Sequence, residues 1–579
     1  MAGRRSVHSF VAALGAVCLA VLLWAAFASR GASVRPDELG FLLNGWVLTG
    51  HNEAIFGADF RSFYTAGYGL ITALAAVVGR GIDAQYRISL LANIALVGAT
   101  VAALARLGFR HLSLSRRTSR TIAIVVALAP AVAANSLFAW SETVNRFAFV
   151  AVALLAYEHV ARPRVATSVM LGAGSSFMVI AHGRFTLMPV VAIALVAAVA
   201  LIGRSPSARR AQLIGLAGIA ATIVAYLVFS RINVSLRREL YPAAGGKEGR
   251  MVDKLLDGSN LPSLGRSAAG QLWYVLATSF GLVAVGFVMN VRAIALGIRR
   301  FRNLQWLAPG FVLAGAASVA LASFLQLLRV IRPDHLVYGR YLEAVSPVFV
   351  MLGLAAVSTG SRVARRAWVW GIVATIAAIA VLTVAAGRDE LRAMISAGGF
   401  FAIPNAIALD WALKLTKPAG YASLTIVFVA LSFVLLAVSR RSTHALLAVL
   451  ATLSLAFTAF TAARTVVPYR DYFDDITLDD SVKELVNSDG RQTTIIFDSG
   501  GLGGQTYFDY RYLLHPIQVE RDDVHWMDRG PLRCVIGAED RAPEDAGWEI
   551  FAHENDGASR GKQKRGNIVL WKRTGVDSC

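Results

Sequence analysis

Acidic residues border apolar stretches at two places early in the chain. Asp37 and Glu38 are adjacent in SVRPDELGFLLNG, just after the first apolar run, and Glu142 lies in AWSETVNR between two later runs. Carboxylates in such positions can deprotonate a hydroxyl nucleophile. The structural alternative is that they only favour the first turns of helices, where the helix dipole stabilises negative charge.

Four further polar residues interrupt apolar sequence. His182 and Arg184 lie in MVIAHGRFTL, and Arg340 and Tyr341 lie in DHLVYGRYLEAVSPVFV. Guanidinium groups form charge-assisted hydrogen bonds to phosphate, and a buried Arg184 requires a carboxylate or phosphate partner. The alternatives are that His182 is a satisfied core residue and that Arg340 extends to lipid headgroups.

The elements that must position these residues are membrane-spanning helices. The 579 residues are 56% hydrophobic and 16% charged, with a mean hydropathy of +0.55. Apolar runs that meet the length needed to cross a bilayer predict about thirteen spans. They lie near 9–29, 88–108, 121–139, 143–160, 165–181, 186–203, 211–229, 270–290, 306–328, 342–359, 367–386, 421–438 and 444–462.

Arginine-rich loops predict the orientation of these spans. The net charge is +20, and alternate loops such as RLGFRHLSLSRRTSR (106–120) and RVARR (362–366) carry much of it. All of them fall on one side if the N-terminus is cytoplasmic, as expected for an integral plasma (inner) membrane protein. Nothing in the basic sequence is typical of nucleic-acid binding. The N-terminal apolar segment also fits a cleaved signal peptide.

The predicted outer face receives a long first loop and the C-terminal tail. The loop, 30–87, contains SFYTAGYGLITALAAVVG, which predicts a helix at the membrane interface or a re-entrant pair. The tail, 464–579, changes to a polar composition and predicts a small α+β domain, with a helix at 481–487 and strands at 493–498, 532–537, 548–552 and 567–573. Cys534 and Cys579 can pair there.

No nucleotide or metal motif is present in the sequence, so we predict no cofactor, although a divalent metal is not excluded. The chain resembles the GT-C superfamily of integral-membrane glycosyltransferases, in the branch of protein O-mannosyltransferases and aminoarabinose transferases. The resemblance rests on RPDELGFLLNGWVLTG, SFYTAGYGLITAL, AWSETVNRFAFVAVALLAYE and YGRYLEAVSPVFVMLGL.

The resemblance implies a GT-C-like membrane domain over 1–463 that transfers a sugar, with inversion, from a polyprenyl-phosphate donor to an extracytoplasmic glycan, lipid or protein. Asp37 is then the candidate base, with Glu38 and Glu142 as its acidic neighbours. The residues implied at the donor phosphate are Arg340, Tyr341, His182 and Arg184.

Two other functions fit the same residues. Intramembrane charges also suit a transporter or flippase of a lipid-linked envelope intermediate, although the charges here gather at span ends and no internal repeat is evident. A non-catalytic envelope assembly protein would use the tail as a binding module. The sequence does not identify the sugar, the acceptor or the oligomeric state.

Overall fold

The structure is a computed structural model of the chain. The residues it describes are 2–29, 35–50, 64–79, 81–202, 208–241, 249–299, 304–328, 337, 339–386, 420–474, 480–483 and, in the tail, 494–498, 507, 510, 513–514, 518–522, 534–539, 547–553 and 568–574. The predicted helix at 481–487 is described only over 480–483, where it is helical. Cys579 lies outside the described residues, whereas Cys534 is disulfide-bonded.

Within these ranges, ten helices are long and apolar enough to cross a membrane. They are α1 (Ala2–Ala28), α4 (Ile82–His111), α7 (Glu142–Ala161), α9 (Met188–Ile202) together with the 3-10 turn η3 (Gly183–Phe185) before it, α10 (Ala208–Leu240), α13 (Leu282–Arg299), α14 (Leu307–Gln326), α16 (Arg362–Ala386), α19 (Gly420–Arg441) and α20 (Thr443–Asp474). Shorter apolar helices are α3 (Ala66–Val78), α8 (Val165–Ala181) and α15 (Ser346–Ser358). The polytopic helical fold is confirmed, but the count of thirteen spans is not.

Two predicted spans are interrupted. The span predicted at 121–139 is α5 (Arg116–Leu128) followed by α6 (Pro130–Ala133) and the 3-10 turn η2 (Ala134–Leu137), with a bend of 70° between the two parts. Pro130 causes the break because proline has no N–H and disfavours helical geometry at the residue before it.

The second interruption lies within the span predicted at 270–290. Here α12 (Leu261–Thr278) ends and α13 begins after Phe280 and Gly281, which have φ angles of 52° and 80°. The indole of Trp368 donates a hydrogen bond of 2.6 Å to the Phe280 carbonyl. The left-handed turn is thus held by a helix distant in sequence, which apolar run length does not reveal.

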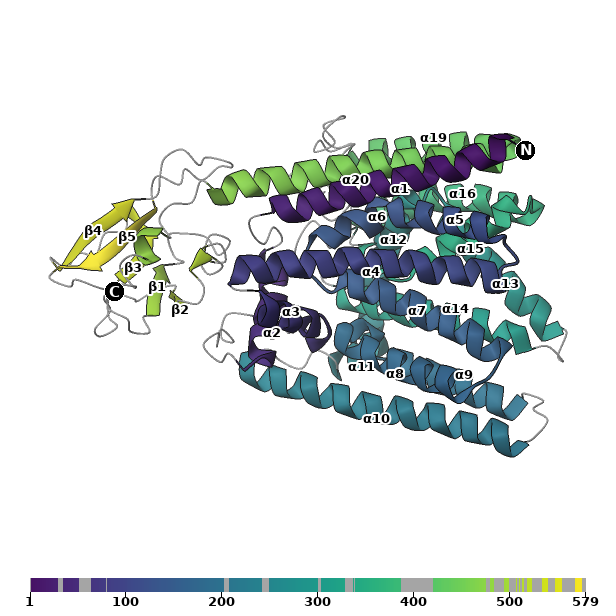
Figure 1. The fold of residues 1–579 in the computed structure, drawn as a ribbon, viewed down its shortest axis with the longest axis horizontal. Helices are drawn as coiled ribbons and strands as arrows, with labels where there is room; N and C mark the ends of the chain where they lie inside the picture. Colours follow the sequence, from purple (N-terminus) through teal and green to yellow (C-terminus); the bar gives the residue numbers. More distant parts are fainter. Residues whose placement is uncertain are drawn as a thin grey trace.

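One end of the bundle carries two short helices, α2 (Arg35–Leu48) and α3, which lie across the ends of the long helices (Figure 1). The Thr72 hydroxyl of α3 donates 2.7 Å to the Phe41 carbonyl of α2. Gly67 lets α3 meet the end of α8, since a Cβ there would lie 2.4 Å from the Cα of Ala181. With 13 residues, α3 is shorter than a span.

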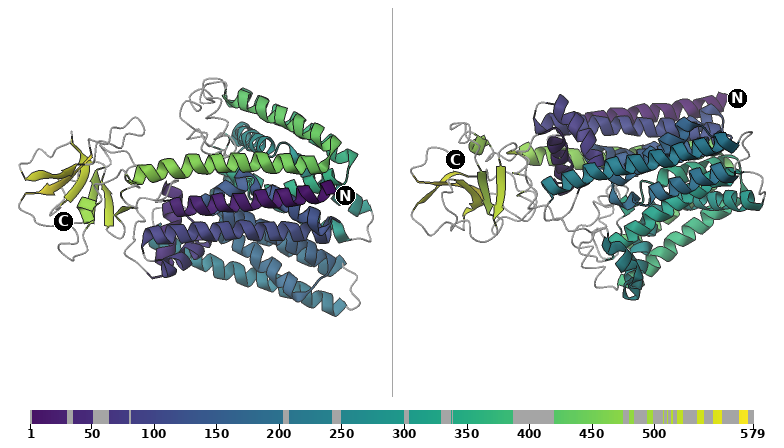
Figure 2. Two further views of the ribbon diagram at one scale, coloured as in Figure 1. Left: turned by 45° about the horizontal axis from the view of Figure 1, so that its top comes forward. Right: turned by 90° about the horizontal axis from the view of Figure 1, so that it is seen from below.

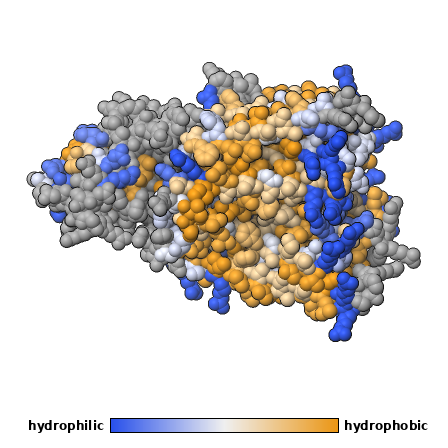
Figure 3. All heavy atoms as spheres, viewed as in Figure 1, coloured by the Kyte–Doolittle hydropathy of each residue, from blue (hydrophilic) through white to orange (hydrophobic). Residues whose placement is uncertain are grey.

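Polarity is distributed in bands along the bundle. On the face shown in Figure 3, an apolar belt covers the middle of the bundle, and a hydrophilic band marks the end where the chain begins. At that end α7 ends at Ala161 and α19 at Arg441, and α5 begins at Arg116 and α16 at Arg362, whereas the tail lies beyond the opposite end (Figures 1 and 2). The arrangement is that of an integral membrane protein whose arginine-rich loops share one side.

The described part of the tail contains a five-stranded mixed sheet in the order β2-β1-β3-β5-β4. Its strands are β1 (Thr494–Asp498), β2 (Gln518–Asp522), β3 (Cys534–Ala538), β4 (Trp548–His553) and β5 (Ile568–Arg573). The four predicted strands correspond to β1, β3, β4 and β5. We did not predict β2, whose sequence QVERD is mostly charged; it is an edge strand, where charges are tolerated. The apolar part of α20 ends at Arg464.

Candidate active site

An ion-pair cluster joins three elements at the end of the bundle nearest the tail. Nη2 of Arg340 lies 2.8 Å from Oδ2 of Asp37, and Nε of Arg340 lies 2.9 Å from Oε1 of Glu142. Asp37 belongs to the first turn of α2 and Glu142 to the first turn of α7, while Arg340 lies in the 3-10 turn η7 (Gly339–Tyr341) that precedes α15. A single guanidinium group therefore bridges both predicted carboxylates.

The side chains of this cluster differ in access to solvent. Asp37 is 30% exposed, Arg340 13% and Glu142 only 4%. The ring of Trp140, in the turn before α7, lies under Arg340, with 4.2 Å between the guanidinium carbon and the ring centre. A cation stacked on indole is held in position by the ring quadrupole. Asp37 is thus the carboxylate of the pair that an incoming molecule can reach most easily.

Tyr64, just before α3, is a partner of Asp37 that sequence reasoning missed. Its hydroxyl donates to Oδ1 of Asp37 at 3.0 Å. Burial, and then the neighbouring Asp37 carboxylate, raise the pKa of Tyr64, so it donates as a neutral phenol. Only the folding of α3 back toward α2 brings Tyr64 to the carboxylate.

Glu38 points away from this cluster although it follows Asp37 directly. Its side chain is fully buried, and its Oε1 accepts hydrogen bonds from the Tyr86 hydroxyl at 3.0 Å and the Ala139 N–H at 2.6 Å. Ala139 lies in the segment between η2 and α7 that also carries Trp140. Glu38 therefore ties α2 to α4 and to the segment beneath Arg340.

His182, Arg184 and Tyr341 form a second group beside the first. The guanidinium of Arg184 lies 3.5 Å from the centre of the Tyr341 ring, and the rings of His182 and Tyr341 are 5.7 Å apart. Nε of Arg184 donates to Nδ1 of His182 at 3.2 Å. Burial, followed by Arg184 and Arg340, lowers the pKa of His182, so a neutral imidazole orients Arg184. Because Tyr341 follows Arg340, the two groups are adjacent.

A third set of polar residues lies behind Arg340 and was also missed. Glu343 is buried; its carboxylate accepts hydrogen bonds from Tyr274 and Asn135 and lies 3.3 Å from Nη2 of Arg146. The signal was present in YLEAVSPVFV, where a glutamate interrupts an apolar run. All seven predicted site residues, with Glu343, thus occupy one region of the fold.

Among the residues that the structure describes, no group of three or more His, Cys, Asp or Glu side chains could hold a metal ion. What the arrangement offers chemically is a partly exposed carboxylate beside a guanidinium that two carboxylates share. Such a pair can bind a phosphate and remove a proton within the same site.

Comparisons with known proteins identify the fold. The chain is similar to the crystal structure of ArnT from Cupriavidus metallidurans bound to undecaprenyl phosphate, with a TM-score of 0.54, 12% identity and coverage of 99% of each chain. The apo structure of ArnT gives a TM-score of 0.52, 14% identity and full coverage of both chains. This chain has an ArnT-like fold.

The likeness is one of fold, since the sequences have diverged far. ArnT is an aminoarabinose transferase of the GT-C superfamily, and the predicted GT-C architecture is confirmed. No family model matches the sequence, and a search of curated proteins found no match. The reaction of this chain must therefore be argued from its own site.

Proposed function

We propose that this chain is an integral-membrane glycosyltransferase that moves a sugar from a polyprenyl-phosphate donor to a hydroxyl group outside the cytoplasm. The observation that carries the proposal is the Asp37–Arg340–Glu142 cluster, in which a guanidinium at the membrane boundary lies beside a partly exposed carboxylate. A base and a phosphate-binding group are the two functions that sugar transfer from a phospholipid donor requires.

Each residue of the cluster has a distinct role in this proposal. The donor phosphate binds Arg340 and competes with Asp37 for the guanidinium, which frees Oδ2 of Asp37. Asp37 then takes the proton of the acceptor hydroxyl as that oxygen forms a bond to C1 of the sugar. The bond between C1 and the phosphate oxygen breaks, and polyprenyl phosphate leaves with inversion at C1. Glu142, nearly inaccessible, keeps Arg340 in place throughout.

The second group extends the proposed phosphate site. Arg184 is buried and lies over the ring of Tyr341, the residue that follows Arg340. It can supply a second positive charge to the donor phosphate. The solved structure of similar fold, that of ArnT, was determined with undecaprenyl phosphate bound, which supports a ligand of this class. The acceptor stays open among glycan, lipid and protein.

The test is a transfer assay with purified protein in lipid, radiolabelled polyprenyl-phosphate sugars and a panel of envelope acceptors. Asp37→Asn should lower the rate of transfer by about 10²–10⁴-fold, the contribution typical of a general base. The matched control is Asp83→Asn, because Asp83 is an exposed residue in the first turn of α4; it should keep the wild-type rate.

Two outcomes would contradict the proposal at different levels. Transfer that survives Asp37→Asn would keep the reaction and exclude Asp37 as its base. No transfer from any donor, together with movement of the lipid between leaflets, would replace the glycosyltransferase with a lipid transporter.

A further inference from the structure

The turn that carries Arg340 is anchored three residues later by a buried carboxylate. After η7, hydrogen bonds from Leu342 N to the Gly339 carbonyl (2.8 Å) and from Val345 N to the Leu342 carbonyl (3.2 Å) continue the turn into α15. Glu343 lies in the middle of this segment and points into the protein, where it is 2% exposed. Arg340 and Glu343 therefore move together, because they share one short, hydrogen-bonded segment.

Three separate elements hold the Glu343 carboxylate. Tyr274 of α12 donates to its Oε1, and Asn135 of η2 donates to its Oε2. Arg146 of α7 approaches Oε2 to 3.3 Å and also donates 3.4 Å to the Val132 carbonyl. A buried carboxylate is stable only with such partners, so its position is closely determined.

The contacts of Glu343 are also connected to the Arg340 guanidinium through Asn135 and Trp140. The indole N–H of Trp140 donates 3.1 Å to the Asn135 carbonyl, and the Trp140 ring lies under the Arg340 guanidinium. Asn135 thus connects the carboxylate behind Arg340 with the ring on which Arg340 stacks. One buried set of contacts therefore fixes both the Arg340 guanidinium and the Glu343 carboxylate.

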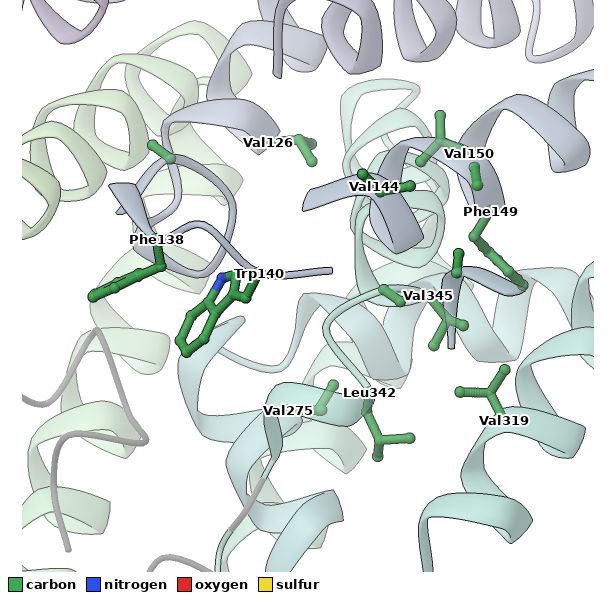
Figure 4. Packing of buried hydrophobic residues seen from close by; sticks show 14 of the residues in the cluster. Val126, Phe138, Trp140, Val144, Phe149, Val150, Val275, Val319, Leu342 and Val345 are labelled. Carbon is green, nitrogen blue, oxygen red and sulfur yellow. The ribbon is translucent and has the colours of Figure 1, made fainter. Parts of the chain in front are cut away.

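Packing around Glu343 reinforces the anchor. Leu342 and Val345 are buried on either side of it and belong to the same hydrophobic cluster as Val275 and Val319 (Figure 4). A core of this kind would accept apolar residues in place of both Glu343 and Arg146, because a buried ion pair rarely stabilises more than well-packed apolar residues would. Stability alone therefore does not account for a charge at this position.

We infer that Glu343 is a positioning residue, which holds the turn so that the Arg340 guanidinium meets the phosphate of a polyprenyl-phosphate ligand. The inference rests on the proposed function for the identity of that ligand. Glu343 does not contact the ligand; its effect on binding passes through Arg340. Its loss should then matter only while Arg340 is present.

A double-mutant cycle tests this dependence. The affinity of the full-length protein in lipid nanodiscs is measured for undecaprenyl phosphate and for undecaprenol, which lacks the phosphate. Glu343→Gln, of nearly equal size, should weaken undecaprenyl phosphate binding by about 10-fold and leave undecaprenol binding unchanged, an energy typical of coupled neighbours. In an Arg340→Gln background the same change should have no further effect.

Two further variants keep the test interpretable. Tyr274→Phe removes one hydrogen bond to Glu343 without leaving a buried charge unpaired. It should weaken phosphate binding about 3-fold, and it takes the place of Glu343→Gln in the cycle if that variant does not fold. Glu158→Gln removes the acidic partner of Arg106 at the other end of the bundle. It controls for loss of an ion pair and should bind both lipids like the wild type.

Every outcome decides the inference. Glu343 would be only a structural residue if Glu343→Gln weakened undecaprenyl phosphate binding by the same factor in the Arg340→Gln background, or if it weakened undecaprenol binding equally. Sugar transfer by the wild type would still support the proposed function in that case. A non-additive cycle without any sugar transfer would keep Glu343 as a positioning residue and contradict the glycosyltransferase. A wild type that binds no undecaprenyl phosphate would overturn both.

Discussion

Adjacent carboxylates perform different tasks in this protein. Successive residues of a helix point about 100° apart, so Asp37 and Glu38 cannot face the same partner. Asp37 reaches Arg340 and Tyr64 at the surface of the site, whereas Glu38 is buried against the Tyr86 hydroxyl and the backbone of Ala139. We therefore propose that Asp37 takes part in the chemistry and that Glu38 supports the structure around it.

Removing Glu38 should accordingly affect stability first. Glu38→Ala leaves a buried N–H and a buried hydroxyl without their acceptor and should lower the free energy of unfolding by about 3 kcal/mol. Glu38→Gln keeps an acceptor oxygen, so it should lower the free energy of unfolding by less than Glu38→Ala does. The measurement is thermal unfolding of the purified protein in detergent. A Glu38→Ala protein with wild-type stability and no transfer would instead assign Glu38 to the reaction.

At the scale of elements, irregular segments rather than regular helices build the site. The break at Pro130 lets the chain turn before α7, so that Trp140 and Glu142 face Arg340. The η7 turn presents Arg340 from the opposite side. Residues at such breaks can approach one another more closely than residues on two packed helices.

Gly339 allows the η7 turn, which carries Arg340, to lie close against Tyr274 of α12. A Cβ at this position would lie 1.7 Å from Cδ1 of Tyr274, so Gly339→Ala must displace either the Tyr274 ring or the Arg340 turn. We expect transfer to fall about 10-fold or more, because small displacements of a binding group can reduce rates strongly. The measurement is the transfer assay described above.

Gly265→Ala provides the matched control. Gly265 lies in the same helix as Tyr274, and a Cβ there would meet nothing within 4 Å. This variant should transfer at the wild-type rate. Equal losses in the two variants would show that α12 tolerates no added methyl group, and that the Gly339 contact has no special importance.

The whole molecule has two chemically different ends. The arginine-rich loops lie at one end of the apolar belt, and the Asp37–Arg340–Glu142 cluster and the tail sheet lie at the other (Figures 1 and 3). Arginine-rich loops stay in the cytoplasm. We therefore propose that the cluster and the tail face the outside, where a donor lipid and an external acceptor can meet.

Cysteine labelling tests this orientation. Ser259, in the exposed 3-10 turn η4 (Gly258–Asn260), and Ser113, exposed in an arginine-rich loop, are replaced by cysteine one at a time. A membrane-impermeant maleimide should label Ser259→Cys in intact cells and Ser113→Cys only after permeabilisation. Unmodified protein is the control, since Cys18 is buried and Cys534 is disulfide-bonded. The reverse labelling would invert the proposed topology.

Several properties of this protein follow from local sequence. Apolar runs and arginine-rich loops determined the membrane fold and the common side of its loops, because both depend on the transfer of nearby residues between water and lipid. Four tail strands could be predicted in the same way, but not the charged edge strand β2. Asp37, Glu142 and Arg340 were recognisable as candidates because charge is rare in apolar sequence.

Only the tertiary structure decided how these candidates meet. Arg340 and Asp37 are 303 positions apart, and no periodicity predicts that one guanidinium lies between two carboxylates. The break beside Gly281, the burial of Glu38 and the partners of Glu343 likewise depend on helices that pack from distant parts of the chain. Side-chain pairing of this kind is settled by packing and desolvation in three dimensions, which local sequence does not contain.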